Sequence, residues 1–235
     1  MWQILAVYAI KLIWLWLVSF GLWRGIKSEV EGKYQIDLLV KLMLWGWMLG
    51  KLAGWSIAHL SGQPLAWWQA RLDIYGVLLG VYWVVYRYQK RKRLVWSGLV
   101  LDQVALALPW LASVWLVLDY WLANQGRISN WPQLASLLAG WVLLGAALWW
   151  LKKHYRRFDW YHSGKVGLVF ASSLWLIGWF RIAWLVYQPQ PGYWWWIGLP
   201  LSAAVVALAS WWIYHLSGRD WSKDKQNLTR LWPIS

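Results

Sequence analysis

Seven long apolar segments alternate with short polar connections along the chain. Each segment approaches or exceeds the length of about 20 residues that one bilayer crossing requires. This pattern predicts an all-α integral membrane protein, with a seven-transmembrane-helix bundle forming one membrane domain over residues 1–235. The predicted spans are residues 2–23, 37–59, 73–88, 99–123, 132–151, 166–187 and 193–216.

Composition excludes several classes of protein. Sixty per cent hydrophobic residues in a chain of 235 is more apolar surface than a soluble domain of this size buries. Cysteine is absent and the four histidines lack ligand spacing, so we expect no metal and no cofactor. Tryptophan is abundant, at 29 residues, and favours membrane interfaces. Trp14, Trp45 and Trp47 lie deep inside predicted spans, where we expect them to pack against glycine-lined helix faces.

Lys and Arg residues are distributed unevenly among the connections. They gather after the spans 2–23, 73–88 and 132–151 and in the C-terminal tail, whereas the opposite connections hold only Arg71 and Arg127. The positive-inside rule therefore predicts that the N-terminus lies outside and the C-terminus is cytoplasmic. Topology and anionic lipid headgroups account for the net charge of +14, so we expect no nucleic-acid partner.

Glycine spacing predicts close helix packing. Residues 46–54 carry a G-x-x-x-G-x-x-x-G pattern, and Gly76 and Gly80 lie four residues apart on one face of a later span. Such faces let two helices approach closely, here within the bundle. The sequence His-Leu-Ser-Gly ends two spans, at Gly62 and Gly218, where we expect a left-handed helix cap.

Charged residues inside the spans need a reason, since each costs about 2.5–3.5 kcal/mol near the bilayer centre. Asp37, Lys41 and Asp102 lie near predicted inner helix ends, where snorkelling or end capping explains them.

A second group of charges lies in the predicted outer half of the membrane. Lys51, Asp119 and Arg181 fall there, on the same side as Asp73 and Tyr75. Two interpretations stay open. Asp119 forms an ion pair with Arg181 or Lys51 that only locks helices together, or the group lines a lipid-headgroup cavity in which Arg181 binds a phosphate through a bidentate contact.

Two segments resemble motifs of the bacterial prolipoprotein diacylglyceryl transferases. Trp68–Gly80, W-Q-A-R-L-D-I-Y-G-V-L-L-G, is similar to that family's W-x-G-G-L-x-I-[HY]-G-G-L-x-G. Ile177–Arg181 is similar to its Y-G-x-x-R. The resemblance runs from about Asp37 to Trp212, and also includes a basic loop followed by Leu-Asp.

The resemblance implies a function and a place for it. Members transfer diacylglyceryl from phosphatidylglycerol to the lipobox cysteine of a prolipoprotein signal peptide, in lipoprotein biosynthesis at the bacterial plasma membrane. It implies Tyr75 and Arg181 as catalytic residues. The lipid-binding residues that we expect are Lys51, Arg71, Gly76, Asp119 and Arg181.

The chain departs from the family at a third motif. The signature G-R-x-G-N-F-x-N-x-E falls on Trp115–Asn124, where Leu116 replaces its arginine and Asn124 its glutamate. Losing one group that stabilises a developing anion costs about 10²–10³ in rate. The alternative is therefore a catalytically inactive protein of the same fold that binds an anionic lipid or a partner membrane protein. A transporter is disfavoured, because the polar group lies in one leaflet and no inverted repeat is visible.

Overall fold

The computed structural model describes residues 2–27, 30–60, 72–91, 94, 97–123, 131–158, 161, 165–187 and 193–219. Within these residues the chain is all-helical, with an isolated bridge between Val30 and Leu94 as its only extended pairing. The helices are α1 (Trp2–Ile26), α2 (Gly32–Leu60), α3 (Ile74–Lys90), α4 (Ser97–Ala123), α5 (Trp131–His154), the 3₁₀ turn η2 (Tyr155–Arg157), α6 (Leu168–Tyr187) and α7 (Tyr193–Leu216).

Each α-helix covers one of the predicted spans, so the all-α prediction is confirmed. In the described part of the chain, α1, α4, α5, α6 and α7 are long and apolar enough to cross a membrane. The 17 residues of α3 reach only roughly 25 Å. The 29 residues of α2 are long enough but include Asp37, Lys41 and Lys51. The count of seven spans and their orientation stay predictions.

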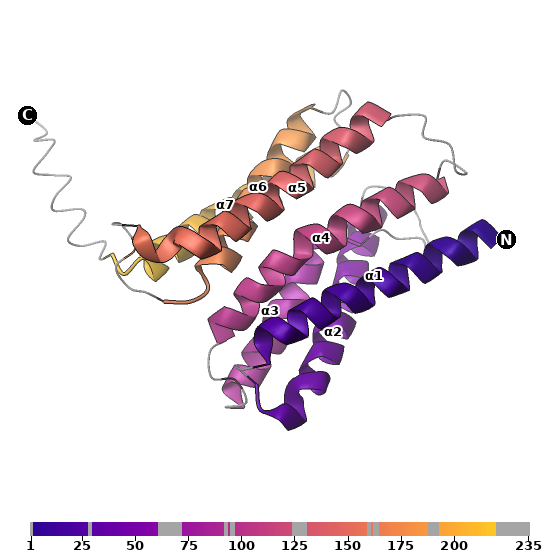
Figure 1. The fold of residues 1–235 in the computed structure, drawn as a ribbon. Coiled ribbons are helices and arrows are strands. Elements are labelled where there is room, and N and C mark those ends of the chain that lie inside the picture. Colours follow the sequence, from indigo (N-terminus) through magenta and orange to yellow (C-terminus); the bar gives the residue numbers. More distant parts are fainter. Residues whose placement is uncertain are drawn as a thin grey trace, which may run out of the picture.

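The helices form two hairpins joined through α4. The pairs α2–α3 and α6–α7 make the most extensive contacts, and α4 contacts α1, α3, α5 and α6. Figure 1 shows α4 in the middle of the molecule, with α1, α2 and α3 on one side and α5, α6 and α7 on the other. A contact between the α2–α3 and α6–α7 hairpins therefore joins the two sides of the bundle.

The α2–α3 hairpin depends on glycines. A Cβ on Gly76 would overlap the carbonyl oxygen of Leu49, and one on Gly80 would overlap the carbonyl oxygen of Trp45. The same Cβ atoms would lie 2.9 Å from the Cα atoms of Gly50 and Gly46, respectively. The backbones of the two helices thus touch, as the glycine spacing predicted.

Large apolar side chains cover much of the outer surface. Leu12, Trp149 and Trp211 are 66%, 61% and 66% exposed, in keeping with surfaces that face lipid. Trp14 is half-buried, whereas Trp45 and Trp47 are 37% and 47% exposed, so a large part of these two indole rings does not pack against glycine as expected. Here α3 occupies the glycine face of α2, which leaves the indole rings on the outside.

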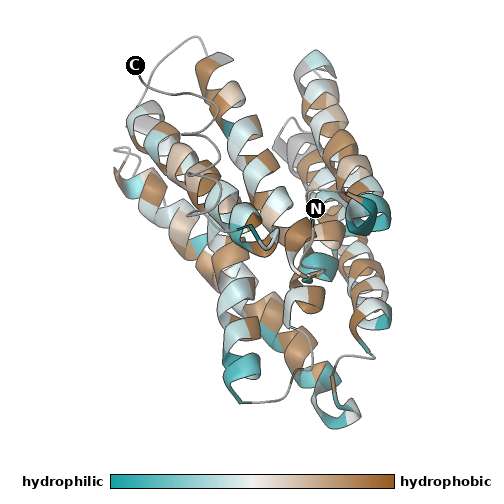
Figure 2. Cartoon of the chain, turned by 90° about the vertical axis from the view of Figure 1, so that its left-hand side faces the viewer, coloured by the Kyte–Doolittle hydropathy of each residue, from teal (hydrophilic) through white to brown (hydrophobic). Residues whose placement is uncertain are grey.

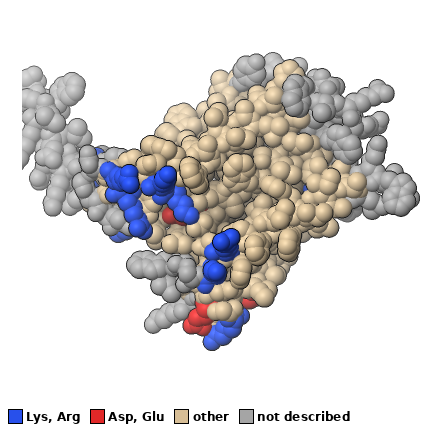
Figure 3. Space-filling model, viewed as in Figure 1, with Lys and Arg blue, Asp and Glu red and all other residues tan. Residues whose placement is uncertain are grey.

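Polar residues concentrate at the helix ends. Figure 2 shows teal at the lower helix ends, and brown mixed with white and pale teal along the helices. In Figure 3 the visible Lys and Arg side chains lie along the left and lower parts of the molecule, and the rest of the described surface is largely tan. Basic residues fall in the last turns of α1, α3 and α5, which matches the charge asymmetry of the sequence.

Two helix ends have the expected polar contacts. Gly218 adopts φ +80° after α7, so the predicted left-handed cap is confirmed there, whereas Gly62 lies outside the described residues. Asp102 on α4 is 5% exposed and accepts hydrogen bonds from the backbone N–H groups of Gly167 (2.9 Å) and Phe170 (2.8 Å). Its carboxylate therefore caps the start of α6, a neighbouring helix, and joins α4 to it.

Candidate functional site

Asp73 organises the beginning of α3. Its carboxylate accepts hydrogen bonds from the backbone N–H groups of Tyr75 (2.9 Å) and Gly76 (3.3 Å), as an N-cap residue does. Its own N–H donates to the carbonyl oxygen of Gly50 at 3.0 Å, which attaches this helix start to α2. A negative charge at a helix N-terminus is also favoured by the helix dipole.

Arg181 reaches this helix start from α6. A terminal nitrogen of its guanidinium donates to the second Asp73 carboxylate oxygen at 2.8 Å, and the two side chains are only 17% and 9% exposed. The guanidinium carbon also lies 4.7 Å from the centre of the Tyr75 ring. Arg181 thus makes an ion pair and a cation–π contact with one turn of α3.

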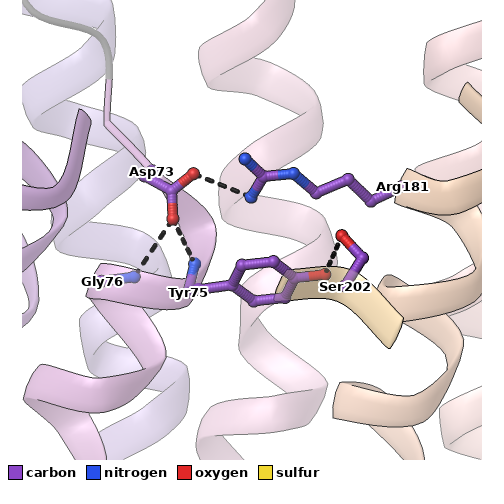
Figure 4. Close-up of polar contacts among 5 residues, drawn as sticks. All are labelled: Asp73, Tyr75, Gly76, Arg181 and Ser202. Atoms are coloured by element: carbon purple, nitrogen blue, oxygen red, sulfur yellow. Dashed lines mark hydrogen bonds and ion pairs between the residues drawn. The ribbon is translucent and has the colours of Figure 1, made fainter. Parts of the chain in front are cut away.

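Tyr75 extends the contact to α7. Its hydroxyl donates to the Oγ of Ser202 at 3.0 Å, and Ser202 is fully buried. Figure 4 shows the Asp73 carboxylate between the guanidinium and the helix N–H groups, with the Tyr75 ring pointing to Ser202. We call Asp73, Tyr75, Arg181 and Ser202 the polar cluster. It joins α3 to both helices of the α6–α7 hairpin.

The structure brings together some of the residues that the sequence singled out. Tyr75 and Arg181 are in contact. Gly76 lies against the backbone of α2, where the absence of a side chain permits helix packing. Lys51 is half-buried on α2, one residue after Gly50, whose carbonyl receives the Asp73 N–H. Arg71 and the side chain of Asp119 lie outside the part of the chain that the structure describes.

Sequence reasoning missed two members of the polar cluster. Asp73 lies on the predicted outer side of the membrane, but the sequence predicts Asp119, and not Asp73, as the partner of Arg181. The signal for Asp73 is its place at the N-cap of α3, two residues before Tyr75. Ser202 gave no signal, since a lone serine in an apolar helix usually bonds to its own backbone.

The polar cluster combines an anion-binding group with a positioned phenol. Arg181 donates one hydrogen bond to Asp73. No other described residue accepts a hydrogen bond from the guanidinium of Arg181. A guanidinium has five N–H donors, and two that lie side by side fit a phosphate. No group of three or more His, Asp or Glu residues in the described ranges has the geometry for a metal ion.

The all-helical fold and the five apolar helices of span length indicate a multi-pass membrane protein. No protein-family model, no curated protein and no solved structure matches the chain.

Proposed function

We propose that this chain is a multi-pass protein of the bacterial plasma membrane that binds phosphatidylglycerol, with the lipid phosphate at Arg181. The proposal rests on the orientation and the hydrogen bonding of this guanidinium. It is oriented by Asp73 and the Tyr75 ring, yet it spends only one of its donors on the described residues. Preorganised arginines of this kind suit the bidentate recognition of phosphate.

The ion pair with Asp73 limits the chemistry of this site. Because the carboxylate already cancels the guanidinium charge, an incoming phosphate gains less from Arg181 than it would from an unpaired arginine. The signature positions that would supply further charge hold Leu116 and Asn124. This combination favours lipid binding without transfer.

Two variants with opposite expected effects on lipid occupancy test the proposal. Arg181→Gln is expected to lose one bound phosphatidylglycerol per chain, because it removes the phosphate-binding group of the polar cluster. Asp73→Asn is expected to raise occupancy several-fold, because asparagine preserves the helix cap while it frees the guanidinium charge. Native mass spectrometry of the full chain, purified in a mild detergent, measures both.

The control for these variants removes a charge elsewhere. Lys33 forms an exposed ion pair with Glu31 at 3.3 Å, and Lys33→Gln is expected to leave lipid occupancy unchanged. If Asp73→Asn and Arg181→Gln both match this control, the polar cluster only locks helices together and the proposed binding is rejected.

Diacylglyceryl transfer is the second candidate function, and the Tyr75 hydroxyl favours it. Transfer breaks the bond between the carbon of the diacylglyceryl group and the phosphate oxygen. It forms a bond from this carbon to the cysteine sulfur, and releases glycerol phosphate and the thiol proton. A phenol held at 3.0 Å from Ser202 is a group through which that proton would pass.

A transfer assay separates the two candidates. We expect no label on a lipobox peptide after incubation with membranes that contain the protein and labelled phosphatidylglycerol, measured against an active transferase. Label on the peptide cysteine would instead establish transfer. In that case Tyr75→Phe, which keeps the ring under Arg181 and removes the hydroxyl, is expected to reduce it by about 10²-fold.

A further inference from the structure

A separate cavity of about 310 Å³ lies between α2 and α3, near the C-terminal end of α3. Its cations are Lys41 of α2 and Arg87 and Arg91 at the end of α3. Arg87 follows Tyr75 by twelve residues, or roughly 18 Å along the helix axis. The cavity is therefore distinct from the polar cluster, which lies at the beginning of the same helix.

The cavity has an excess of positive charge. Lys41 makes an ion pair with Asp37 at 2.7 Å, and the hydroxyl of the buried Tyr88 also donates to this carboxylate. Asp37 thus cancels one of the three cations. Among the described residues, no carboxylate makes an ion pair with Arg87 or Arg91. No described carboxylate therefore compensates the charges of these two guanidinium groups beside the cavity.

Two tryptophan rings line this cavity, and both are partly exposed on the outer surface. The Arg87 guanidinium carbon lies 4.7 Å from the centre of the Trp83 ring. Trp83 and Trp45 both line the cavity and are 41% and 37% exposed. Arginines beside half-exposed tryptophans near the end of α3 present the two surfaces that a phospholipid needs, a cationic one for the headgroup and an apolar one for the chains.

We propose that this cavity binds the phosphodiester headgroup of an anionic phospholipid. Arg87 and Arg91 would contact the phosphate oxygens, and the lipid chains would lie along Trp45 and Trp83. Basic pockets between membrane helices recognise anionic headgroups in this way, and guanidinium groups do so through paired hydrogen bonds. Under the predicted orientation the lipid belongs to the cytoplasmic leaflet, whereas the polar cluster faces the opposite one.

Charge-neutral substitutions test this site in the full chain. The protein is reconstituted in nanodiscs of phosphatidylcholine with increasing phosphatidylglycerol, and bound lipid is counted by native mass spectrometry. Arg87→Gln together with Arg91→Gln is expected to weaken binding of one phosphatidylglycerol on the order of tenfold, because two phosphate contacts are lost. Both arginines are exposed, so the variant should keep its elution volume and thermal midpoint.

The matched control removes two charges from another basic helix end. Lys152→Gln with Lys153→Gln at the end of α5 is expected to leave the affinity unchanged. Equal losses in both double variants would overturn the proposal, since they would show a general effect of surface charge. No loss in either variant would also overturn it, because the arginines would then only complement the end of α3.

Two further measurements identify the ligand and distinguish this cavity from the polar cluster. Inorganic phosphate at millimolar concentration is expected not to displace the lipid, because it lacks chains for the tryptophan wall. Displacement by phosphate would mean a site for a soluble anion and would reject the lipid proposal. Arg181→Gln is expected to leave binding at Arg87 and Arg91 intact, so the failure of one site is distinguishable from the failure of the other.

Discussion

Replacing Asp73 with alanine is expected to lower the free energy of unfolding by about 3 kcal/mol or more. The change leaves the Arg181 guanidinium, 17% exposed, without its carboxylate. It also removes the acceptor for the N–H groups of Tyr75 and Gly76, which costs about 1 kcal/mol as the loss of an N-cap.

A double-mutant cycle separates the charge from the cap. Arg181→Met removes the charge, so in the Asp73→Ala background it is expected to restore part of the lost stability. Asp73→Asn keeps the cap, and its deficit should therefore fall below that of Asp73→Ala. The measurement is the unfolding of purified variants in mixed detergent micelles, followed by circular dichroism. Additive effects of Asp73→Ala and Arg181→Met, within about 0.5 kcal/mol, would show that the pair does not couple α3 to α6.

Replacing Gly76 with alanine is expected to destabilise the α2–α3 hairpin by about 3 kcal/mol. The new methyl group would overlap the Leu49 carbonyl oxygen and approach the Gly50 Cα to 2.9 Å. These are backbone atoms, which cannot move aside as the end of a flexible side chain does. The helices must separate, and the loss includes the hydrogen bond from the Asp73 N–H to the Gly50 carbonyl.

Gly21 on α1 offers a matched control, because a Cβ there would meet no atom within 4 Å. Alanine has a higher helix propensity than glycine by about 1 kcal/mol, so Gly21→Ala is expected to be neutral or slightly stabilising. Thermal midpoints of both variants, measured by fluorescence-detected size exclusion, give the comparison. Equal midpoints for Gly76→Ala and Gly21→Ala would contradict the close approach of α2 and α3.

The order of helices was predictable because the hydrophobic effect and the length of a bilayer crossing act locally along the chain. The predicted span 99–123 and the helix Ser97–Ala123 differ by only two residues. Gly76 and Gly80 were also readable as a packing face, since residues four apart share one side of a helix. Gly46 and Gly50 form a second such face, and the structure packs the two faces together.

The partner of Arg181 was not predictable, because pairing depends on which helix ends meet in space. Asp73 and Arg181 are separated by 108 positions in the sequence. Spacing gives no rule for such a contact, and Asp119 was as plausible a partner for Arg181 in sequence. The same holds for Ser202, which becomes a site residue only because α7 carries it to the Tyr75 hydroxyl.

The class of protein, the helices and the glycine faces along which two of them pack thus follow from the amino-acid sequence. These properties follow from periodicity and composition, which each segment carries within itself. The tertiary structure alone decided that Asp73 pairs with Arg181, that Trp45 faces outward, and that Lys41, Arg87 and Arg91 surround one cavity. These depend on the angle and register at which α2, α3, α6 and α7 meet, which arise only when the hairpins pack together.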